Sequence, residues 1–266
     1  MALADVFAAG DAKACCAAVY DHPGVRWLLG GELHPGGEAL TLRTARLAGI
    51  TRAQRVLDLA SGDGATARLL ARQLGVDAVG VDYSAAAVAA AEAAARAEGL
   101  SDQVSFVQGD AEALPFDEAS FDAAICECSL CTFPDKGAAV QELARVLCPG
   151  GVLAIADVTA DRGRVPPLLR NAVARVACVA DALPLNGYER LLSDAGLMLI
   201  ASERADGALA AMVDRIEARL KVARMARLPE IEELRPELDL GLDALALARN
   251  AIAAGELGYA LIVASR

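Results

Sequence analysis

The segment "VLDLASGDGATARLL" (residues 56–70) decides the fold of this chain. An apolar run over residues 55–60 ends in a turn that carries Gly62 and Gly64, and a helical pattern follows over residues 65–75. The next run, "DAVGVD" (residues 77–82), has the composition of a second strand. A strand, a glycine-bearing turn, a helix and another strand are the parts of one βαβ crossover, so the segment predicts two neighbouring parallel strands.

The same alternation continues towards the C-terminus. Apolar runs and helical periodicity predict strands at 104–108, 121–127, 151–158, 198–204 and 258–266, and helices at 84–98, 136–147, 168–181, 186–197, 209–228 and 242–254. Ser84 is the expected N-cap of its helix. This order predicts an α/β fold with a doubly wound, mostly parallel, Rossmann-like sheet and helices on both faces. The two helices before the last strand predict a helical insertion there.

The length of 266 residues suits a single domain. Within it we expect an N-terminal helical segment (1–50), a ligand-binding core (51–158) and a C-terminal part (159–266) that holds the insertion and the closing strands. No internal repeat and no clear linker divides these parts.

Composition narrows the class of partner. The chain has 25 basic and 36 acidic residues and a net charge of −11, which disfavours nucleic acid and anionic membranes as main partners. The sequence predicts no signal peptide and no membrane span. Its 7 cysteines are odd in number and irregular in spacing, unlike a secreted disulfide framework. We therefore expect a cytoplasmic protein with reduced thiols, for which an oligomer is possible.

Acidic side chains stand at three successive strand ends. Asp58 ends the first strand, Asp82 ends the second, and Asp110 follows the third. The carboxyl ends of parallel strands meet at one edge of the sheet, where open α/β sheets bind ligands. Asp82, about twenty residues after the glycine turn, is placed to accept both hydroxyls of a ribose. The sequence thus predicts a nucleoside-binding crevice.

Four blocks together resemble the class I S-adenosylmethionine-dependent methyltransferases: "VLDLASGDGATARLL", "VGVDYS", "GDAEALPFDEASFDAAICE" and "RVLCPGGVLAIADV". The resemblance covers about residues 55–158. It implies S-adenosylmethionine as cofactor, with Gly62 and Gly64 beside its methionine part, Asp82 on the ribose, and Asp110 with Ala111 at the adenine. The implied cofactor-binding set also includes Asp58, Ala60, Tyr83 and Glu127. Ala60 stands where many members carry the first glycine of the turn.

A second resemblance concerns the methyl acceptor. The segment "FDAAICECSLCTFPDK" (residues 121–136) is similar to the arsenite methyltransferase branch and places Cys128 on an arsenic-binding cysteine. Two further segments, "ACVADALPLNGYERLLSDAGL" and "ACCAAVYDHPGVRWLLGG", place Cys178 and either Cys15 or Cys16 on the other two ligands. The resemblance implies a trivalent metalloid held by the thiolates of Cys128, Cys178 and a third cysteine, for which Cys16 is taken as the ligand. Thiolates suit a soft, thiophilic centre. A thiol reductant such as glutathione or thioredoxin would then be a partner.

Two alternatives stay open from the residues alone. The first is a small-molecule O-, N- or C-methyltransferase with structural thiols, for which Glu127, Asp157 or Tyr188 are candidate general bases. The second is a non-catalytic, thiol-based metalloid sensor.

A zinc clip within "CECSLC" is disfavoured, because three close thiols lack a fourth ligand. Cys126 and Cys128 are expected on one face of the strand, with Cys126 in the core, and Cys131 falls in the loop beyond.

Overall fold

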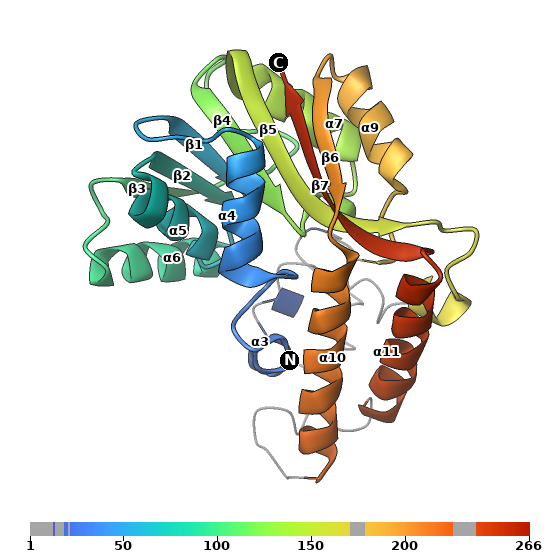
Figure 1. Ribbon diagram of the computed structural model, residues 1–266. Helices are drawn as coiled ribbons and strands as arrows, with labels where there is room; N and C mark the ends of the chain where they lie inside the picture. The colour runs from blue at the N-terminus through green and yellow to red at the C-terminus, as the bar shows by residue number, and fades with distance from the viewer. Residues whose placement is uncertain (1–12, 14–18, 21, 171–178, 226–237) are drawn as a thin grey trace.

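The computed structural model describes residues 13, 19–20, 22–170, 179–225 and 238–266. One seven-stranded sheet forms its centre, in the order β3-β2-β1-β4-β5-β7-β6 (Figure 1). The strands are β1 (Arg55–Leu59), β2 (Asp77–Asp82), β3 (Val104–Gln108), β4 (Phe121–Glu127), β5 (Leu147–Ala160), β6 (Met198–Arg204) and β7 (Leu257–Ser265). The helices are α3 (Pro23–Leu29), α4 (Gly37–Leu47), α5 (Ala65–Leu74), α6 (Ala85–Ala97), α7 (Lys136–Val146), α9 (Leu185–Asp194), α10 (Asp206–Met225) and α11 (Leu238–Ala253).

The sheet is mixed, with one strand running against the others. Strands β1 to β5 pair in parallel, whereas β7 is antiparallel to both β5 and β6. The predicted doubly wound, mostly parallel sheet is therefore confirmed. The chain leaves β1 on one side for β2 and β3 and returns on the other side at β4. Such a reversal opens a crevice at the carboxyl ends of the strands.

Local chemistry explains the first crossover. Gly64 is the N-cap of α5 with φ of 75°, a conformation that favours glycine. A Cβ added at Gly64 would come within 2.3 Å of the Phe106 ring, so the site also demands a residue without a side chain. The predicted N-cap of α6 is confirmed, because the Ser84 side chain accepts a hydrogen bond from the Ala87 N–H.

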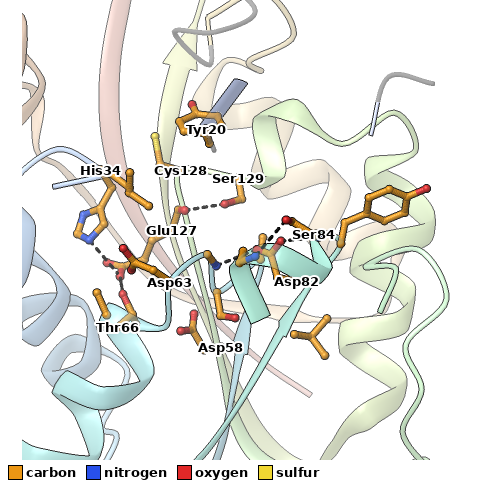
Figure 2. Close-up of a pocket in the computed structure, with 18 of the residues that line it drawn as sticks. Tyr20, His34, Asp58, Asp63, Thr66, Asp82, Ser84, Glu127, Cys128 and Ser129 are labelled. Carbon is orange, nitrogen blue, oxygen red and sulfur yellow. Dashed lines mark hydrogen bonds and ion pairs between the residues drawn. The ribbon is translucent and has the colours of Figure 1, made fainter. Parts of the chain in front are cut away.

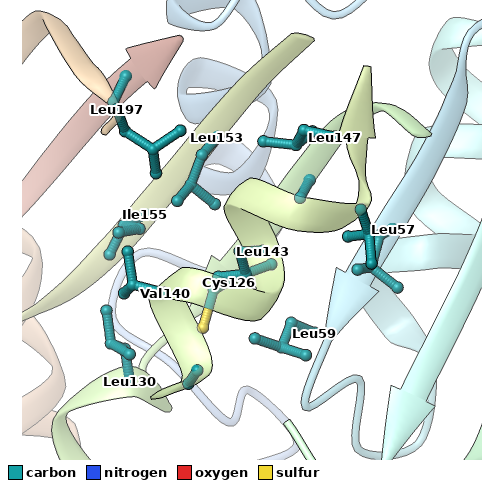
Figure 3. Packing of buried hydrophobic residues seen from close by; sticks show 14 of the residues in the cluster. Leu57, Leu59, Cys126, Leu130, Val140, Leu143, Leu147, Leu153, Ile155 and Leu197 are labelled. Atoms are coloured by element: carbon teal, nitrogen blue, oxygen red, sulfur yellow. The ribbon is translucent and has the colours of Figure 1, made fainter. Parts of the chain in front are cut away.

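Helices cover both faces of the sheet, as predicted. Ala45, Leu70 and Ala91, from α4, α5 and α6, pack on the face that carries Ile125. Helices α7 and α9 cover the opposite face with a core of leucine, valine and isoleucine side chains (Figure 3). Cys126 lies in this second core with no exposed surface, which confirms its interpretation as a packing residue.

The helical insertion lies between β6 and β7, as expected. Helix α10 begins at Asp206 and α11 at Leu238, each earlier than the predicted starts at 209 and 242. The α10 helix runs beside α3 (Figure 1). The Arg219 guanidinium lies 5.5 Å from the centre of the Trp27 ring, and Arg215 forms an ion pair with Glu32 at 2.7 Å. The insertion therefore braces the end of α3 and the segment 30–36, which joins α3 to α4.

The predicted helix at 168–181 falls largely outside the described residues. Its described beginning is a short 3-10 turn at Pro167–Arg170, and residues 171–178 are not described. Among the helices that the structure describes, none combines the length and the apolar character that a membrane crossing requires.

Candidate cofactor and acceptor site

A cavity of about 500 Å³ opens at the carboxyl ends of the parallel strands. We call its two parts the Asp82 side (Asp82, Tyr83, Asp110 and Ala111) and the Glu127 side (Tyr20, His34, Thr41, Glu127 and Cys128); all of these residues line it. In Figure 2, Asp82 and Ser84 lie to the right of His34 and Glu127. The crevice predicted from three acidic strand ends is present, because Asp58 also lines the cavity.

Asp82 fixes the conformation of the loop between β1 and α5 (residues 60–64), which we call the glycine loop. Its carboxylate accepts hydrogen bonds from the Gly62 N–H at 2.8 Å and from the Ser84 N–H at 2.9 Å. The loop is consequently tied to the end of β2, and each oxygen of the Asp82 carboxylate accepts one of these two hydrogen bonds. Gly62, with φ of 55°, faces the cavity, where an added Cβ would come within 3.3 Å of Leu33.

Ala60 adopts a left-handed backbone conformation, with φ of 57°. An L-residue with a side chain is strained by about 1 kcal/mol there, whereas glycine is not. We therefore expect Ala60→Gly to raise the free energy of unfolding by about 1 kcal/mol, measured by urea denaturation. The matched control is Ala90→Gly on the exposed side of α6, which should lower it by about as much. A destabilised Ala60→Gly variant would contradict the strain.

Asp110 is engaged by a residue from the N-terminal part of the chain. The Lys13 ammonium lies 2.7 Å from Asp110 and 2.6 Å from Glu112. Burial raises the pKa of Asp110, but hydrogen bonds from Lys13 and the Glu112 N–H, with the Lys13 charge, outweigh it and hold the pKa below its usual value. Asp110 is thus a carboxylate at the end of the Asp82 side, and sequence reasoning did not anticipate its lysine partner.

Glu127 is almost fully enclosed, with 4% of its side-chain surface exposed. It ends β4 and accepts hydrogen bonds from the Thr41 hydroxyl, at 2.9 and 3.1 Å, and from the Thr66 hydroxyl at 2.7 Å. The His34 imidazole Nε2 lies 3.6 Å from it. Figure 2 shows His34 and Thr66 on either side of this carboxylate. Glu127 is among the residues predicted from the sequence, but its three partners are not. They lie 61 to 93 residues away from it in the chain.

Asp58 lies beneath the loop with 3% of its surface exposed. One of its carboxyl oxygens accepts the Ala67 N–H at 3.1 Å. Burial, followed by repulsion from Glu127, raises the pKa of Asp58 well above its usual value. Two enclosed carboxyl groups therefore stand close together at the centre of the site.

Cys128 follows β4 with a left-handed φ of 52°, and its N–H donates to the Ala156 carbonyl at 2.7 Å. This twist corrects the expectation that Cys126 and Cys128 share a face. Cys126 packs in the core under α7, whereas Cys128 packs with the cluster on the other face, which also contains Cys131. Cys128 lines the cavity, as predicted.

The metalloid prediction also depends on cysteines other than Cys128. Cys15, Cys16 and Cys178 lie outside the described residues. Within the part of the chain that the structure describes, no three His, Cys, Asp or Glu side chains group as a metal site.

Two predicted bases and one predicted cofactor contact lie away from the cavity wall. Asp157 has no exposed surface and accepts the N–H groups of Cys131 and Val158, at 2.9 and 2.7 Å. Tyr188 is equally enclosed, and its hydroxyl donates to the Val158 carbonyl at 3.0 Å. Both interpretations as general bases are wrong, because these groups are used inside the core. Gly64 shapes the turn against Phe106 rather than lining the cavity.

The lining is strongly acidic. Its carboxyl groups belong to Glu32, Glu38, Asp58, Asp63, Asp82, Asp110, Glu112 and Glu127. The lysine and the arginine that line it, Lys13 and Arg26, form ion pairs with Asp110 and with Asp63. A cationic ligand that contains a ribose and an adenine suits this acidic lining. A carboxyl group lies at each strand end beside which one part of such a ligand would bind. S-adenosylmethionine is such a cation, so the residues present fit it.

The sheet order, the glycine loop and the acidic strand ends define the class I methyltransferase fold. The family model described as "Methyltransferase domain" matches residues 57–155. A curated relative, O-methyltransferase resE of Aspergillus sclerotiorum, is 31% identical over 216 residues, which cover 80% of this chain and 76% of that protein. The chain belongs to the S-adenosylmethionine-dependent methyltransferases.

Two further similarities bear on how far this assignment extends. Methyltransferase GfsG of Streptomyces halstedii is 34% identical over 171 residues, 63% of this chain and 61% of that protein. The match thus spans less than two thirds of that relative. The crystal structure of the [4+2]-cyclase SpnF superposes with a TM-score of 0.78 at 23% identity, over 94% of this chain and 95% of that one. That likeness concerns the fold alone.

The resemblance to the arsenite branch gains no support from these relatives. Two of the three names describe methyltransferases, one of them an O-methyltransferase, and the third describes a cyclase; none of them mentions a metalloid. The open alternative, a small-molecule methyltransferase, agrees better with them.

Proposed function

We propose that this protein transfers the methyl group of S-adenosylmethionine to a small organic acceptor, at an oxygen or carbon atom. The observation that carries the proposal is one continuous cavity, which joins Asp82 and Asp110 to His34 and Glu127. The first pair suits the adenosine of the cofactor, and the second pair lines space for a second molecule. The relatives named above add support, since one is described as an O-methyltransferase.

The cofactor, when bound, supplies an activated methyl group, and the chain supplies position and environment. Asp82 and Asp110 would hold the ribose and the adenine, and the glycine loop would approach the methionine part. On the Glu127 side, Tyr20, His34 and Cys128 would surround the acceptor. His34 and Glu127 are the groups there that can accept a proton from an acceptor hydroxyl.

A metalloid acceptor is the second candidate, and Cys128 favours it because its thiol group lines the cavity. This interpretation needs Cys178 and Cys15 or Cys16 as further ligands, and it stays a prediction. It also needs a thiol reductant, which methyl transfer to an organic acceptor does not.

The test measures S-adenosylhomocysteine release in two arms. One arm offers the purified protein S-adenosylmethionine with a panel of phenols, hydroxyquinones and hydroxylated polyketides. The other offers arsenite and glutathione. We expect turnover in the first arm that the Cys128→Ser variant retains.

Turnover only with arsenite, abolished in Cys128→Ser, would instead establish the metalloid acceptor. A protein that binds neither S-adenosylmethionine nor S-adenosylhomocysteine in calorimetry would overturn the proposed function altogether.

A further inference from the structure

Glu127 is held rigidly next to the glycine loop. Thr66, two residues after Gly64, fixes one carboxylate oxygen at 2.7 Å, and Thr41 from α4 donates to both oxygens. Because β4, α4 and the first turn of α5 meet at this point, the position of the charge is set by three separate elements. The carboxylate cannot swing out to solvent without breaking these hydrogen bonds.

The charges around Glu127 leave it short of positive compensation. Asp58, on β1, and Glu127 repel one another, and Asp63 and Asp82 line the same cavity, where Asp63 is paired with Arg26. Among the described residues, its ion-pair contact is with His34, whose side chain is 15% exposed. Two enclosed carboxyl groups with one imidazole form a site that a cationic ligand stabilises.

S-adenosylmethionine and its product differ in charge at one atom. The sulfonium of the cofactor is positive, whereas the thioether of S-adenosylhomocysteine is neutral; the ammonium, carboxylate, ribose and adenine are common to both. We propose that Glu127 is the residue that makes this site prefer S-adenosylmethionine over S-adenosylhomocysteine, through its enclosed negative charge. This inference rests on the proposed function and concerns the methionine end of the same cavity.

The consequence for the reaction cycle is product release. After methyl transfer the sulfur of the ligand loses its positive charge, while the Glu127 carboxylate stays in place. The attraction that held the cofactor therefore weakens in the product complex. Interactions with ribose and adenine, which do not change, cannot produce this difference.

The experiment compares the two ligands by isothermal titration calorimetry. The ratio of their dissociation constants isolates the sulfonium, because every shared contact cancels. In the wild type we expect S-adenosylmethionine to bind at least ten-fold more tightly than S-adenosylhomocysteine. For Glu127→Gln we expect the affinity for S-adenosylmethionine to fall about ten-fold. The affinity for S-adenosylhomocysteine should change by less than three-fold. Sinefungin, which carries a protonated amine near the sulfonium position, should behave as S-adenosylmethionine does.

Two further variants separate charge from shape. Thr66→Val removes a hydrogen-bond donor but keeps the carboxylate, so the ratio should stay within about two-fold of wild type. Glu92→Gln, on α6 away from the cavity, makes the same change in net charge and should leave both affinities unaltered. Should Glu127→Gln fail to fold, Thr41→Val with Thr66→Val frees the carboxylate, and the ratio should shrink.

Equal losses for both ligands in Glu127→Gln would overturn the inference, since they would mean that the carboxylate acts on the shared ammonium. A wild-type ratio near one would overturn it as well. Absence of binding by either ligand in the wild type would instead contradict the proposed function.

Discussion

Asp82→Ala is expected to weaken S-adenosylmethionine binding at least hundred-fold in calorimetry. The substitution removes the carboxylate that suits the ribose hydroxyls. It also leaves the N–H groups of Gly62 and Ser84 without the acceptor that fixes the loop at 2.8 and 2.9 Å. Loss of a charged acceptor for two ligand hydroxyls and loss of the preorganised loop each account for roughly ten-fold or more.

The control for this prediction lies in the same strand. Asp77 begins β2 at the edge opposite the cavity, and it is exposed. Asp77→Ala should bind the cofactor as the wild type does. Asp82→Asn should fall between, because its amide oxygen can still accept one loop N–H. Wild-type affinity in Asp82→Ala would show that the crevice end of β2 does not hold the ribose.

Asp58→Asn is expected to stabilise the cofactor-free protein at alkaline pH. Because the pKa of Asp58 is raised in the folded state, its contribution to stability is full below the unfolded pKa and is lost as the pH rises through the folded pKa. Asparagine keeps an acceptor for the Ala67 N–H but carries no charge. At pH 8 we expect a gain of about 2 kcal/mol, or roughly 5 °C in Tm.

The gain should shrink as the pH falls towards 4, because Asp58 is then protonated in the folded state and increasingly protonated in the unfolded state as well. Differential scanning calorimetry across pH 4 to 8 measures it. Asp122→Asn is a suitable control, because Asp122 also accepts a backbone N–H, from Arg55 at 2.8 Å, but at an exposed position. A Tm of Asp58→Asn below wild type at every pH would mean that the Ala67 hydrogen bond outweighs burial of the charge.

The same variant should lose cofactor affinity while gaining stability. An enclosed carboxyl group that is unfavourable without a ligand becomes favourable beside a cation. The stability of the empty protein and its affinity for S-adenosylmethionine are therefore expected to change in opposite directions at this position.

The parts of the fold that follow from local pattern were predictable from the sequence. Strand β1, the turn at Gly62 and helix α6 with its Ser84 cap depend on residues close together in the chain, and the structure matches them. The carboxylates of Asp82 and Asp110 were found because parallel strands place their ends at one edge. Local periodicity also located α10 and α11, with their starts misplaced by about one turn.

The contacts that join distant segments were not predictable. Thr41, His34 and Lys13 carry no pattern that marks them, and they meet Glu127 and Asp110 only because the sheet brings α4 and the N-terminal part to the cavity. Asp157 was misread for a related reason. Its place near the end of the predicted strand resembles that of Asp82, but β5 continues to Ala160 and backbone N–H groups already bind the Asp157 carboxylate.

The bracing of segment 30–36 by helix α10 has a consequence for how such a protein diversifies. The stretch of gene that encodes the insertion, residues 206–256, is separate from the stretch that encodes the glycine loop and the ribose carboxylate. Exchange of the insertion between relatives would reshape the wall near Trp27 and Glu32 and leave Asp82 and Asp110 untouched. Recombination at the end of β6 and at the start of β7 is therefore a route by which one ancestral cofactor site can acquire new acceptors. The same two positions are natural crossover points for protein engineering.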